Sequence, residues 1–332
     1  MKNFRTCLAA TFAALGLLGA SAHAQDGAAL YNGKTVSYIV ATAPGGGYDS
    51  YGRLVAEFMQ KYLPGSTFVV RNMPGAGHLI GANALYASKA DGLTLGTFNT
   101  GLLYNQIVAN EGVKFDLNKY SWIGKAASDA RVFAIAAQSP VKTWQDLVAS
   151  KETVNFATAG VGSASFVETV ILTKALGLPI KMQTGYNGSD DQLAMRRGEI
   201  TGSIASRSSY DQFIKNGFGR YIAQIGGHDN DTPQLKTLLK DANGLELLAL
   251  IESTSEIARL TAGPPGVPAA QLAALRDAYK KAMEDKELQA RAEKLERPVE
   301  PLYGDDIAKM ISAALKQSPD TVALLKDAMG KK

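Results

Sequence analysis

Apolar residues follow two different spacings along the first hundred residues, and each spacing predicts a different element. Residues 35–41, 68–70 and 93–98 are short runs rich in β-branched, aromatic or aliphatic side chains, typical of buried strands. Between them, apolar residues recur every three or four positions over 54–62, and a second helix is predicted over 79–87. The order strand, helix, strand, helix, strand favours a parallel sheet with helices on both faces.

A second alternation of strands and helices begins near residue 131. The predicted strands span 131–136, 154–157, 180–184 and 200–205, and the predicted helices begin at 143, cover 166–176 and include 193–195. A cluster rich in proline and glycine follows at 261–268, and apolar residues then return at helical spacing. The chain therefore predicts two α/β units followed by ordinary packing helices.

The N-terminal segment has the three parts of a secretory signal peptide. Two basic residues are followed by an uncharged run over 6–22 that is rich in Ala and Leu, and Ala22-His23-Ala24 fits a small-x-small cleavage site. We expect residues 1–24 to be removed after Ala24, so that Gln25 begins a periplasmic protein. An uncleaved anchor is the alternative, although the run is shorter than the ~20 residues that span a bilayer.

The composition excludes several classes of chemistry. Cys7 lies inside the signal, so the mature chain has no disulfide, thiol nucleophile or cysteine metal ligand. Only His78 and His228 remain after cleavage, which is little material for a zinc site or a catalytic triad. The net charge of +4 falls to +2 when Lys2 and Arg5 leave with the signal. We therefore expect no metal, no cofactor and no nucleic-acid partner.

A glycine-rich loop follows the first predicted strand and precedes the first predicted helix. The backbone N–H groups of such a turn, with the positive end of the helix dipole, favour an anion. The candidate ligand-binding residues of this loop are Ala43, Pro44, Gly45, Gly46, Gly47, Tyr48 and Asp49. The spacing fits neither a dinucleotide-binding loop nor a P-loop. Two plainer interpretations stay open, a tight turn and an Asp49 carboxylate paired with Arg53.

The second α/β unit carries a similar strand end, small-residue turn and helix start. Its candidate ligand-binding residues are Gly160, Gly162, Ser163, Ala164 and Ser165. Each serine can donate a hydrogen bond to a ligand oxygen, but its position favours capping of the helix. If the two loops face one cleft, two helix N-termini present partial positive charge to a ligand at the carboxyl edges of two sheets.

Three further side chains are candidates for the same cleft. Arg207 directly follows the last strand of the second unit, where its guanidinium could bind a carboxylate or remain a solvated surface group. Phe166 and Tyr186, together with Tyr48, could form apolar walls or belong to the core.

Several of these motifs together resemble the Bug family, the periplasmic receptors of tripartite tricarboxylate transporters. The most specific match covers residues 39–49 and Arg53, which correspond to an apolar strand, P-G-G-G-x-D and a downstream Arg. Residues 69–77 match V-V-x-N-x-P-G-A-G, and residues 91–95 match D-G-x-T-L. The likeness continues toward the C-terminal helices at 160–163, 186–188, 198–200 and 262–268.

The resemblance implies a type II periplasmic-binding-protein fold, in which two α/β domains enclose a ligand cleft and are joined by two crossovers. The first domain is expected to comprise residues 25–128 and 256–332, and the second residues 129–255. The family holds a ligand carboxylate with the loops that match 43–49 and 160–165. The resemblance also implies that the cleft is faced by Asn99, Thr100, Tyr186 and Asn187.

The chain departs from the common family pattern at four positions. Tyr48 replaces a typical Thr, His78 falls where Gly is usual, and Phe166 takes the place of a frequent His. Asn187 stands where Lys or Arg is frequent. These replacements remove positive charge and add aromatic surface, which suggests a less highly charged or more apolar carboxylate.

From these features we expect a monomeric solute-binding protein that captures a small mono- or dicarboxylate, aromatic acids included. It would deliver the ligand to the membrane subunits of a tripartite tricarboxylate-type transporter and would not be an enzyme. A receptor that feeds a sensor kinase shares every feature and stays open. An exported hydrolase built on Ser163 or Ser165 would need a base, and no motif links His78 or His228 to either serine.

Overall fold

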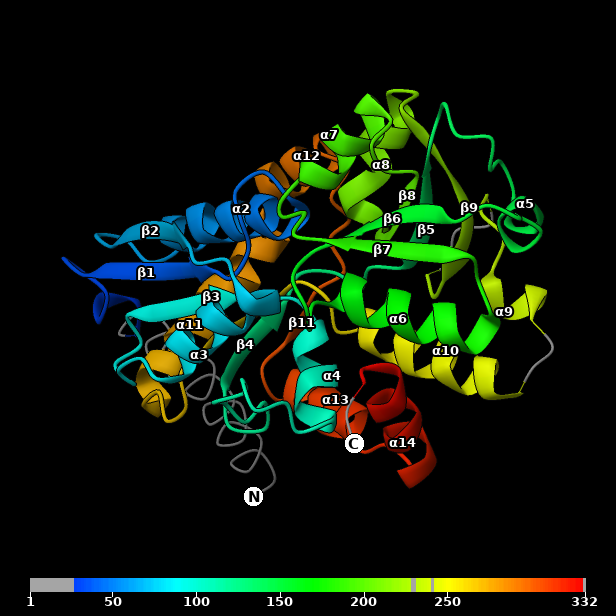
Figure 1. Cartoon of the computed structure of the whole chain (residues 1–332). Coiled ribbons are helices and arrows are strands. Elements are labelled where there is room, and N and C mark those ends of the chain that lie inside the picture. Colours follow the sequence, from blue (N-terminus) through cyan, green and yellow to red (C-terminus); the bar gives the residue numbers. More distant parts are fainter. Residues whose placement is uncertain (1–26, 228–230, 240–241, 331–332) are drawn as a thin grey trace, which may run out of the picture.

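The computed structural model describes residues 27–227, 231–239 and 242–330, and it shows two α/β units side by side (Figure 1). The predicted signal peptide and His228 lie outside the described residues. Within the described part of the chain, no helix is both long and apolar enough to cross a membrane.

The first unit is built on a six-stranded sheet with the order β11-β4-β10-β3-β1-β2. Its strands are β1 Thr35–Val40, β2 Thr67–Asn72, β3 Thr94–Thr97, β4 Ser121–Lys125, β10 Leu260–Gly263 and β11 Leu302–Tyr303. The predicted parallel arrangement is confirmed for β1, β2 and β3. The complete sheet is mixed, because β10 enters from a distant part of the chain and pairs antiparallel with both β3 and β4.

The second unit is built on a five-stranded sheet with the order β7-β6-β8-β5-β9. Its strands are β5 Arg131–Ala136, β6 Val154–Thr158, β7 Ile180–Thr184, β8 Gly202–Ser206 and β9 Gly219–Ile225. β6 runs parallel to β7 and β8, whereas β5 runs antiparallel to both β8 and β9. The first residue of β5 therefore lies at the same sheet edge as the last residue of β8.

The helices cover both faces of each sheet. They are α2 Gly47–Lys61, α3 Leu79–Tyr86, α4 Gly101–Ile107, α5 Trp144–Val148, α6 Ala164–Leu176, α7 Asp190–Arg197, α8 Arg207–Lys215, α9 Leu235–Leu238, α10 Ala242–Ser255, α11 Ala269–Glu284, α12 Lys286–Lys294, α13 Asp305–Leu315 and α14 Pro319–Ala328, and a short 3-10 turn, η1, covers Ala76–His78. In the first unit, buried side chains of α2, α11 and α12 pack on one face of the sheet, and those of α3, α4 and α13 pack on the other. In the second unit, α6 and α10 cover one face, and α7 and α8 cover the other.

Apolar spacing explains the helices that the sequence predicted. In α2, Leu54, Val55, Phe58 and Met59 are buried on one side of the helix, as the spacing of three and four residues requires. α5 begins at a capping box, in which the Thr143 side chain accepts from the backbone N–H of Asp146 and the Asp146 carboxylate accepts from that of Thr143. Local sequence therefore sets where these helices begin and which face they bury.

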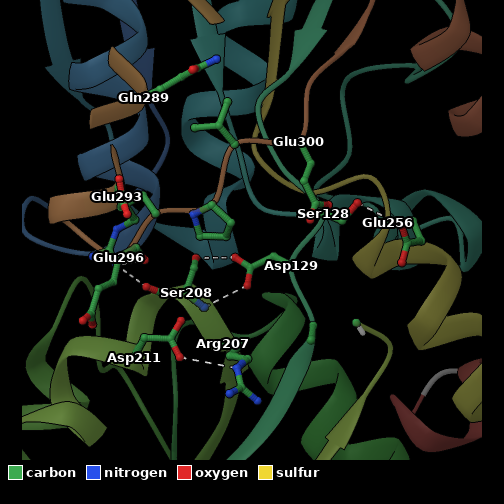
Figure 2. Close-up of a pocket in the computed structure, with 15 residues that line it drawn as sticks. Ser128, Asp129, Arg207, Ser208, Asp211, Glu256, Gln289, Glu293, Glu296 and Glu300 are labelled. Carbon is green, nitrogen blue, oxygen red and sulfur yellow. Dashed lines mark hydrogen bonds and ion pairs between the residues drawn. The ribbon is translucent and has the colours of Figure 1, made fainter. Parts of the chain in front are cut away.

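The chain passes between the two sheets at residues 126–130 and again at 255–259, and the two crossovers are hydrogen-bonded to each other. The backbone N–H of Ala126 donates to the Arg259 carbonyl, and that of Asp129 donates to the Ser255 carbonyl, both at 3.0 Å. The side chains of Asp129 and Arg259 form a buried ion pair. Asp129 also accepts from the N–H and hydroxyl of Ser208 in the first turn of α8, at 3.0 and 2.7 Å (Figure 2).

The C-terminal helix crosses back to the second unit. α14 packs on α6, and Leu325 is fully buried in the hydrophobic core of the second unit. The preceding helix α13 contributes Ile307 and Ile311 to the core of the first unit. We therefore propose domains of residues 25–128 with 256–318, and of residues 129–255 with α14, in place of a first domain that runs to residue 332.

We expect Asp129→Ala to lower the free energy of unfolding by about 3–5 kcal/mol, because it leaves the Arg259 guanidinium buried without its counter-charge. Urea denaturation followed by circular dichroism measures the change. The control is Asp277→Ala, since the Asp277–Lys281 pair is exposed and contributes less than about 1 kcal/mol. Equal losses in the two variants would contradict a structural role for the buried pair.

Candidate ligand-binding cleft

A small cavity of about 90 Å³ lies between the two units, at the carboxyl ends of β1, β6 and β8. Ligands of open α/β sheets bind at such edges. The residues that line the cavity are Thr42, Gly46, Gly47, Tyr48, His78, Asn99, Arg131, Ala159, Ser165, Tyr186, Asn187, Gly188, Asp191, Gln192, Ser203, Ala205, Ser206, Ser209 and Tyr210. Both units contribute, so a ligand here would touch both.

The N-terminus of α2 opens onto this cavity. Gly46 is the N-cap residue in an extended conformation, and no side chain of the described residues caps the helix. Gly46, Gly47 and Tyr48 line the cavity. Because the first N–H groups of a helix have no partner within it and carry its positive dipole end, they favour an anion here.

Asp49 fixes the glycine loop from behind and does not line the cavity. Its carboxylate accepts from the Gly45 N–H and from Arg53 Nε, both at 3.0 Å, and from Asn72 Nδ2 at 2.8 Å. Burial favours a raised pKa for Asp49, but the hydrogen bonds from Arg53, Gly45 and Asn72 outweigh it and hold the pKa below its usual value. The structure thus places the Asp49–Arg53 pair in the loop as a supporting contact.

The N-terminus of α6 is occupied by protein groups. Ser163 Oγ accepts from the Phe166 N–H at 3.3 Å, and Asn99 Oδ1 of the first unit accepts from the Ala164 N–H at 2.9 Å. Ser165 lines the cavity, and its Oγ accepts from the Ala159 N–H at 3.1 Å. The second predicted loop therefore reaches the cavity mainly through Ser165.

The remaining glycines of that loop pack against the first unit. Asn105 Nδ2 donates to the Gly162 carbonyl at 2.6 Å. A Cβ placed on Gly77 would lie 2.3 Å from the Val161 carbonyl oxygen, and one placed on Gly160 would lie 2.8 Å from the Gly77 nitrogen. The backbones of the two units are therefore in close contact at this loop.

Two further helix N-termini reach the cavity from the second unit. α8 begins after Ser206 and α7 begins after Ser189, and neither serine side chain caps its own helix. Carboxylates engage both first turns instead, because Asp129 accepts from the Ser208 N–H and Asp191 accepts from the Gln192 N–H. The same turns bring Ser209 and Asp191 to the cavity wall. Since protein carboxylates occupy the first turns of α7 and α8, α2 is the helix among those described at the cavity whose N-terminus stays open to an anion.

Arg131 places a guanidinium at the cavity, but a buried carboxylate neutralises it. Its Nε donates to Glu168 Oε2 at 2.6 Å and its Nη1 donates to Ser206 Oγ at 2.8 Å. Glu168 accepts a further hydrogen bond from the Tyr104 hydroxyl at 3.2 Å. The pair offers polar edges to a ligand without net charge.

Arg207 points away from this cavity. Its Nη1 donates to Gln224 Oε1 at 2.8 Å, its Nη2 donates to Asp231 at 2.9 Å, and its guanidinium lies 4.8 Å from the centre of the Tyr221 ring. It lines a second, larger cavity of about 770 Å³ beside the crossovers, where Figure 2 shows it facing Asp211. The carboxylates gathered around that cavity disfavour an anion there.

His78 enters the cavity from a left-handed backbone conformation, with φ of 79°. This explains why glycine suits the position in the family pattern. His78 Nδ1 lies 2.7 Å from the Ala41 carbonyl oxygen, and burial lowers the pKa of the ring. The neutral ring therefore donates from Nδ1, which leaves Nε2 as a hydrogen-bond acceptor.

The predicted site residues divide into two groups. Those that line the cavity are Gly46, Gly47, Tyr48, Asn99, Ser165, Tyr186 and Asn187. Those that lie behind it or elsewhere are Ala43, Pro44, Gly45, Asp49, Thr100, Gly160, Gly162, Ser163, Ala164, Phe166 and Arg207. Phe166 packs against the core of the second unit. Residues 203–210 form a serine-rich strand-to-helix junction that resembles the two predicted loops. This pattern could have indicated from the sequence that the junction belongs to the site.

Residues 52–325 match the family described as "Tripartite tricarboxylate transporter family receptor". A Cupriavidus necator relative, "UPF0065 protein in gbd 5'region", is 27% identical over 288 residues, which cover 84% of this chain and 83% of the relative. An Agrobacterium vitis relative, "UPF0065 protein in the TAR-I ttuE-ttuC' intergenic region", is 32% identical over 166 residues, which cover 48% and 46% of the two chains.

Solved structures share the fold. The periplasmic binding protein BugD has a TM-score of 0.74 at 20% identity, covering 89% of this chain and 97% of its own. MatC (Rpa3494) from Rhodopseudomonas palustris with bound malate has a TM-score of 0.71 at 18% identity, covering 89% and 99%. R. palustris Rpa4515 with adipate also has a TM-score of 0.71, at 15% identity, covering 90% and 97%. The chain therefore has the two-domain periplasmic-binding-protein fold and belongs to the receptor family of tripartite tricarboxylate transporters, as a periplasmic solute-binding protein.

Proposed function

We propose that this receptor captures a small carboxylate in the cleft and delivers it to the membrane subunits of a tripartite tricarboxylate transporter. The observation that carries the proposal is the N-terminus of α2, which opens onto a cavity shared by both units without a capping side chain among the described residues. The structures named with malate and adipate, both dicarboxylates, support a carboxylate as the ligand class. We further propose export by cleavage after Ala24 and action as a monomer.

Closure of the two units is the proposed mechanism. In the structure, Pro44 and Gly46 of the first unit approach Gly188 of the second so closely that a Cβ on Gly46 would lie 2.9 Å from the Gly188 carbonyl oxygen. Asn99 and Ala164 form a hydrogen bond across the same boundary. A carboxylate held between α2 and the second unit adds contacts that exist only in the closed form, so it shifts the population toward closure.

A hydrolase reaction finds little support in the same geometry. Ser163 Oγ caps α6, and Ser165 Oγ accepts from the Ala159 N–H. His78 is the only histidine among the described residues. Its Nδ1 forms a hydrogen bond with the Ala41 carbonyl rather than with either serine. A base paired with a serine nucleophile is the first requirement of such a reaction.

We expect the chain that begins at Gln25 to gain thermal stability from one class of carboxylate. A ligand at a hundredfold its Kd adds about 2.7 kcal/mol to the free energy of unfolding. Thermal unfolding against aliphatic mono- and dicarboxylates, citrate-like tricarboxylates, aromatic acids and amino acids measures the gain, with sugars and amines that lack a carboxylate as controls. Stabilisation by the controls alone would contradict a carboxylate receptor.

Gly46→Val should reduce ligand affinity at least a hundredfold and leave the fold intact. The Gly46 backbone is extended, so valine fits the conformation, but its Cβ would meet the Gly188 backbone and hold the units apart. Ser50→Val is the control, because it adds the same side chain one turn later, at a position that does not line the cavity. Calorimetric titration and circular dichroism measure affinity and fold. Wild-type affinity in Gly46→Val would exclude this loop from the site.

A further inference from the structure

The ionised side chains that line the cleft leave it with negative rather than positive charge. Arg131 is the cation that lines the cavity, and the Glu168 carboxylate pairs with it at 2.5 Å. Asp191 is the carboxylate that lines the cavity, and within the described part of the chain no Lys or Arg lies within ion-pair distance of it. The other basic side chain that lines the cavity is His78, which burial keeps neutral. The cleft therefore holds one uncompensated carboxylate.

The neighbours of Asp191 leave acceptor capacity for a ligand. Its Oδ2 accepts from the Tyr210 hydroxyl at 2.5 Å, and its Oδ1 accepts from the Gln192 N–H at 2.8 Å. A carboxylate has about four lone-pair directions, so two remain. The Asp191 side chain is half-buried at the cavity wall.

Burial also sets the protonation of Asp191. It raises the pKa of this carboxyl to about 6, although the hydrogen bonds from Tyr210 and Gln192 act in the opposite direction. Asp190, one residue away, adds negative charge that also raises this pKa. At neutral pH Asp191 is therefore ionised in an environment that disfavours its charge, and a cation placed beside it by a ligand would relieve this cost.

The same small cavity offers an anion site and a cation site. The free N–H groups at the start of α2 attract a carboxylate, and Gly46 of that loop packs on Gly188, three residues before Asp191. Both sites line one cavity of about 90 Å³, so a small molecule that meets both must carry opposite charges a short way apart.

We propose that the ligand is a small zwitterion, a carboxylate with a protonated amine a few bonds away, and that Asp191 binds the ammonium group. This inference rests on the proposed carboxylate receptor and narrows its ligand class. A second carboxylate would instead meet the Asp191 charge, and like charges at close range in a cleft are unfavourable. The cleft thus selects against dicarboxylates such as the malate and adipate named with the two related structures.

The test is a calorimetric titration of the chain from Gln25 with ligands matched in length. The zwitterions are alanine, β-alanine and 4-aminobutyrate, the dicarboxylates are malonate, succinate and glutarate, and the monocarboxylates are propionate and butyrate. We expect at least one zwitterion to bind tenfold or more tighter than its matched acids. Asp191→Asn should weaken that zwitterion at least tenfold and strengthen the dicarboxylates, because it removes the charge and keeps the shape.

Asp190→Asn is the matched control. Asp190 is the neighbouring carboxylate on the same first turn, it is exposed, and it does not line the cavity. Its substitution should leave the order of ligands unchanged. If Asp191→Asn does not fold, Asp191→Ala and the wild-type order of affinities decide the question.

The outcomes separate the two proposals. Tighter binding of a dicarboxylate or a simple monocarboxylate by the wild-type chain would overturn the zwitterion inference and leave the carboxylate receptor standing. Equal losses in Asp191→Asn and Asp190→Asn would overturn the role of Asp191. A folded chain that binds none of these acids, with or without an amine, would contradict the carboxylate receptor itself and the inference with it.

Discussion

The buried ion pair between Asp129 and Arg259 is the contact on which the arrangement of both units depends. It joins the two crossovers, and Asp129 also holds the first turn of α8 through Ser208. On its other side, the Arg259 guanidinium lies 4.2 Å from the centre of the Tyr48 ring, within the first turn of α2. A Cβ on Gly47 would lie 2.9 Å from Arg259 Nη2, so this glycine leaves room for the hinge cation directly beneath the ligand loop. The hinge and the cleft therefore share one set of contacts.

Local sequence was sufficient to predict the helices and strands whose apolar residues mark one buried face or whose ends are marked by glycine or proline. β1, α2 and β6 belong to this group, because each combines a clear apolar period with a glycine or proline boundary. β4 and β10 were not predicted. Both are buried at every residue and show no alternation, and they become strands by pairing with each other across a long stretch of chain. Their place in the sheet is a tertiary property, and so is the antiparallel direction of β10.

The site was predicted in part for the same reason. The Gly46–Gly47 turn has a local signature, whereas the role of Arg131 depends on β5 running antiparallel to β8, which brings the first residue of one strand to the last residue of the other. Arg207 follows the same strand end as Ser206, yet Asp231 and Gln224 engage its guanidinium on the far side of the sheet edge. Asn99 was predicted to face the cleft, and it does, but its oxygen is engaged by the Ala164 amide. Sequence indicated which loops meet and could not indicate which donors remain available.

The return of α14 to the second unit gives the molecule a third covalent connection. Two adjacent crossovers define a hinge about which the units can swing, but the link at 316–318 lies away from that hinge, between α13 in one core and α14 in the other. Any opening must therefore bend this link or slide α14 along α6 while Leu325 stays buried. The C-terminal helix is thus a further connection that any relative motion of the two units has to accommodate.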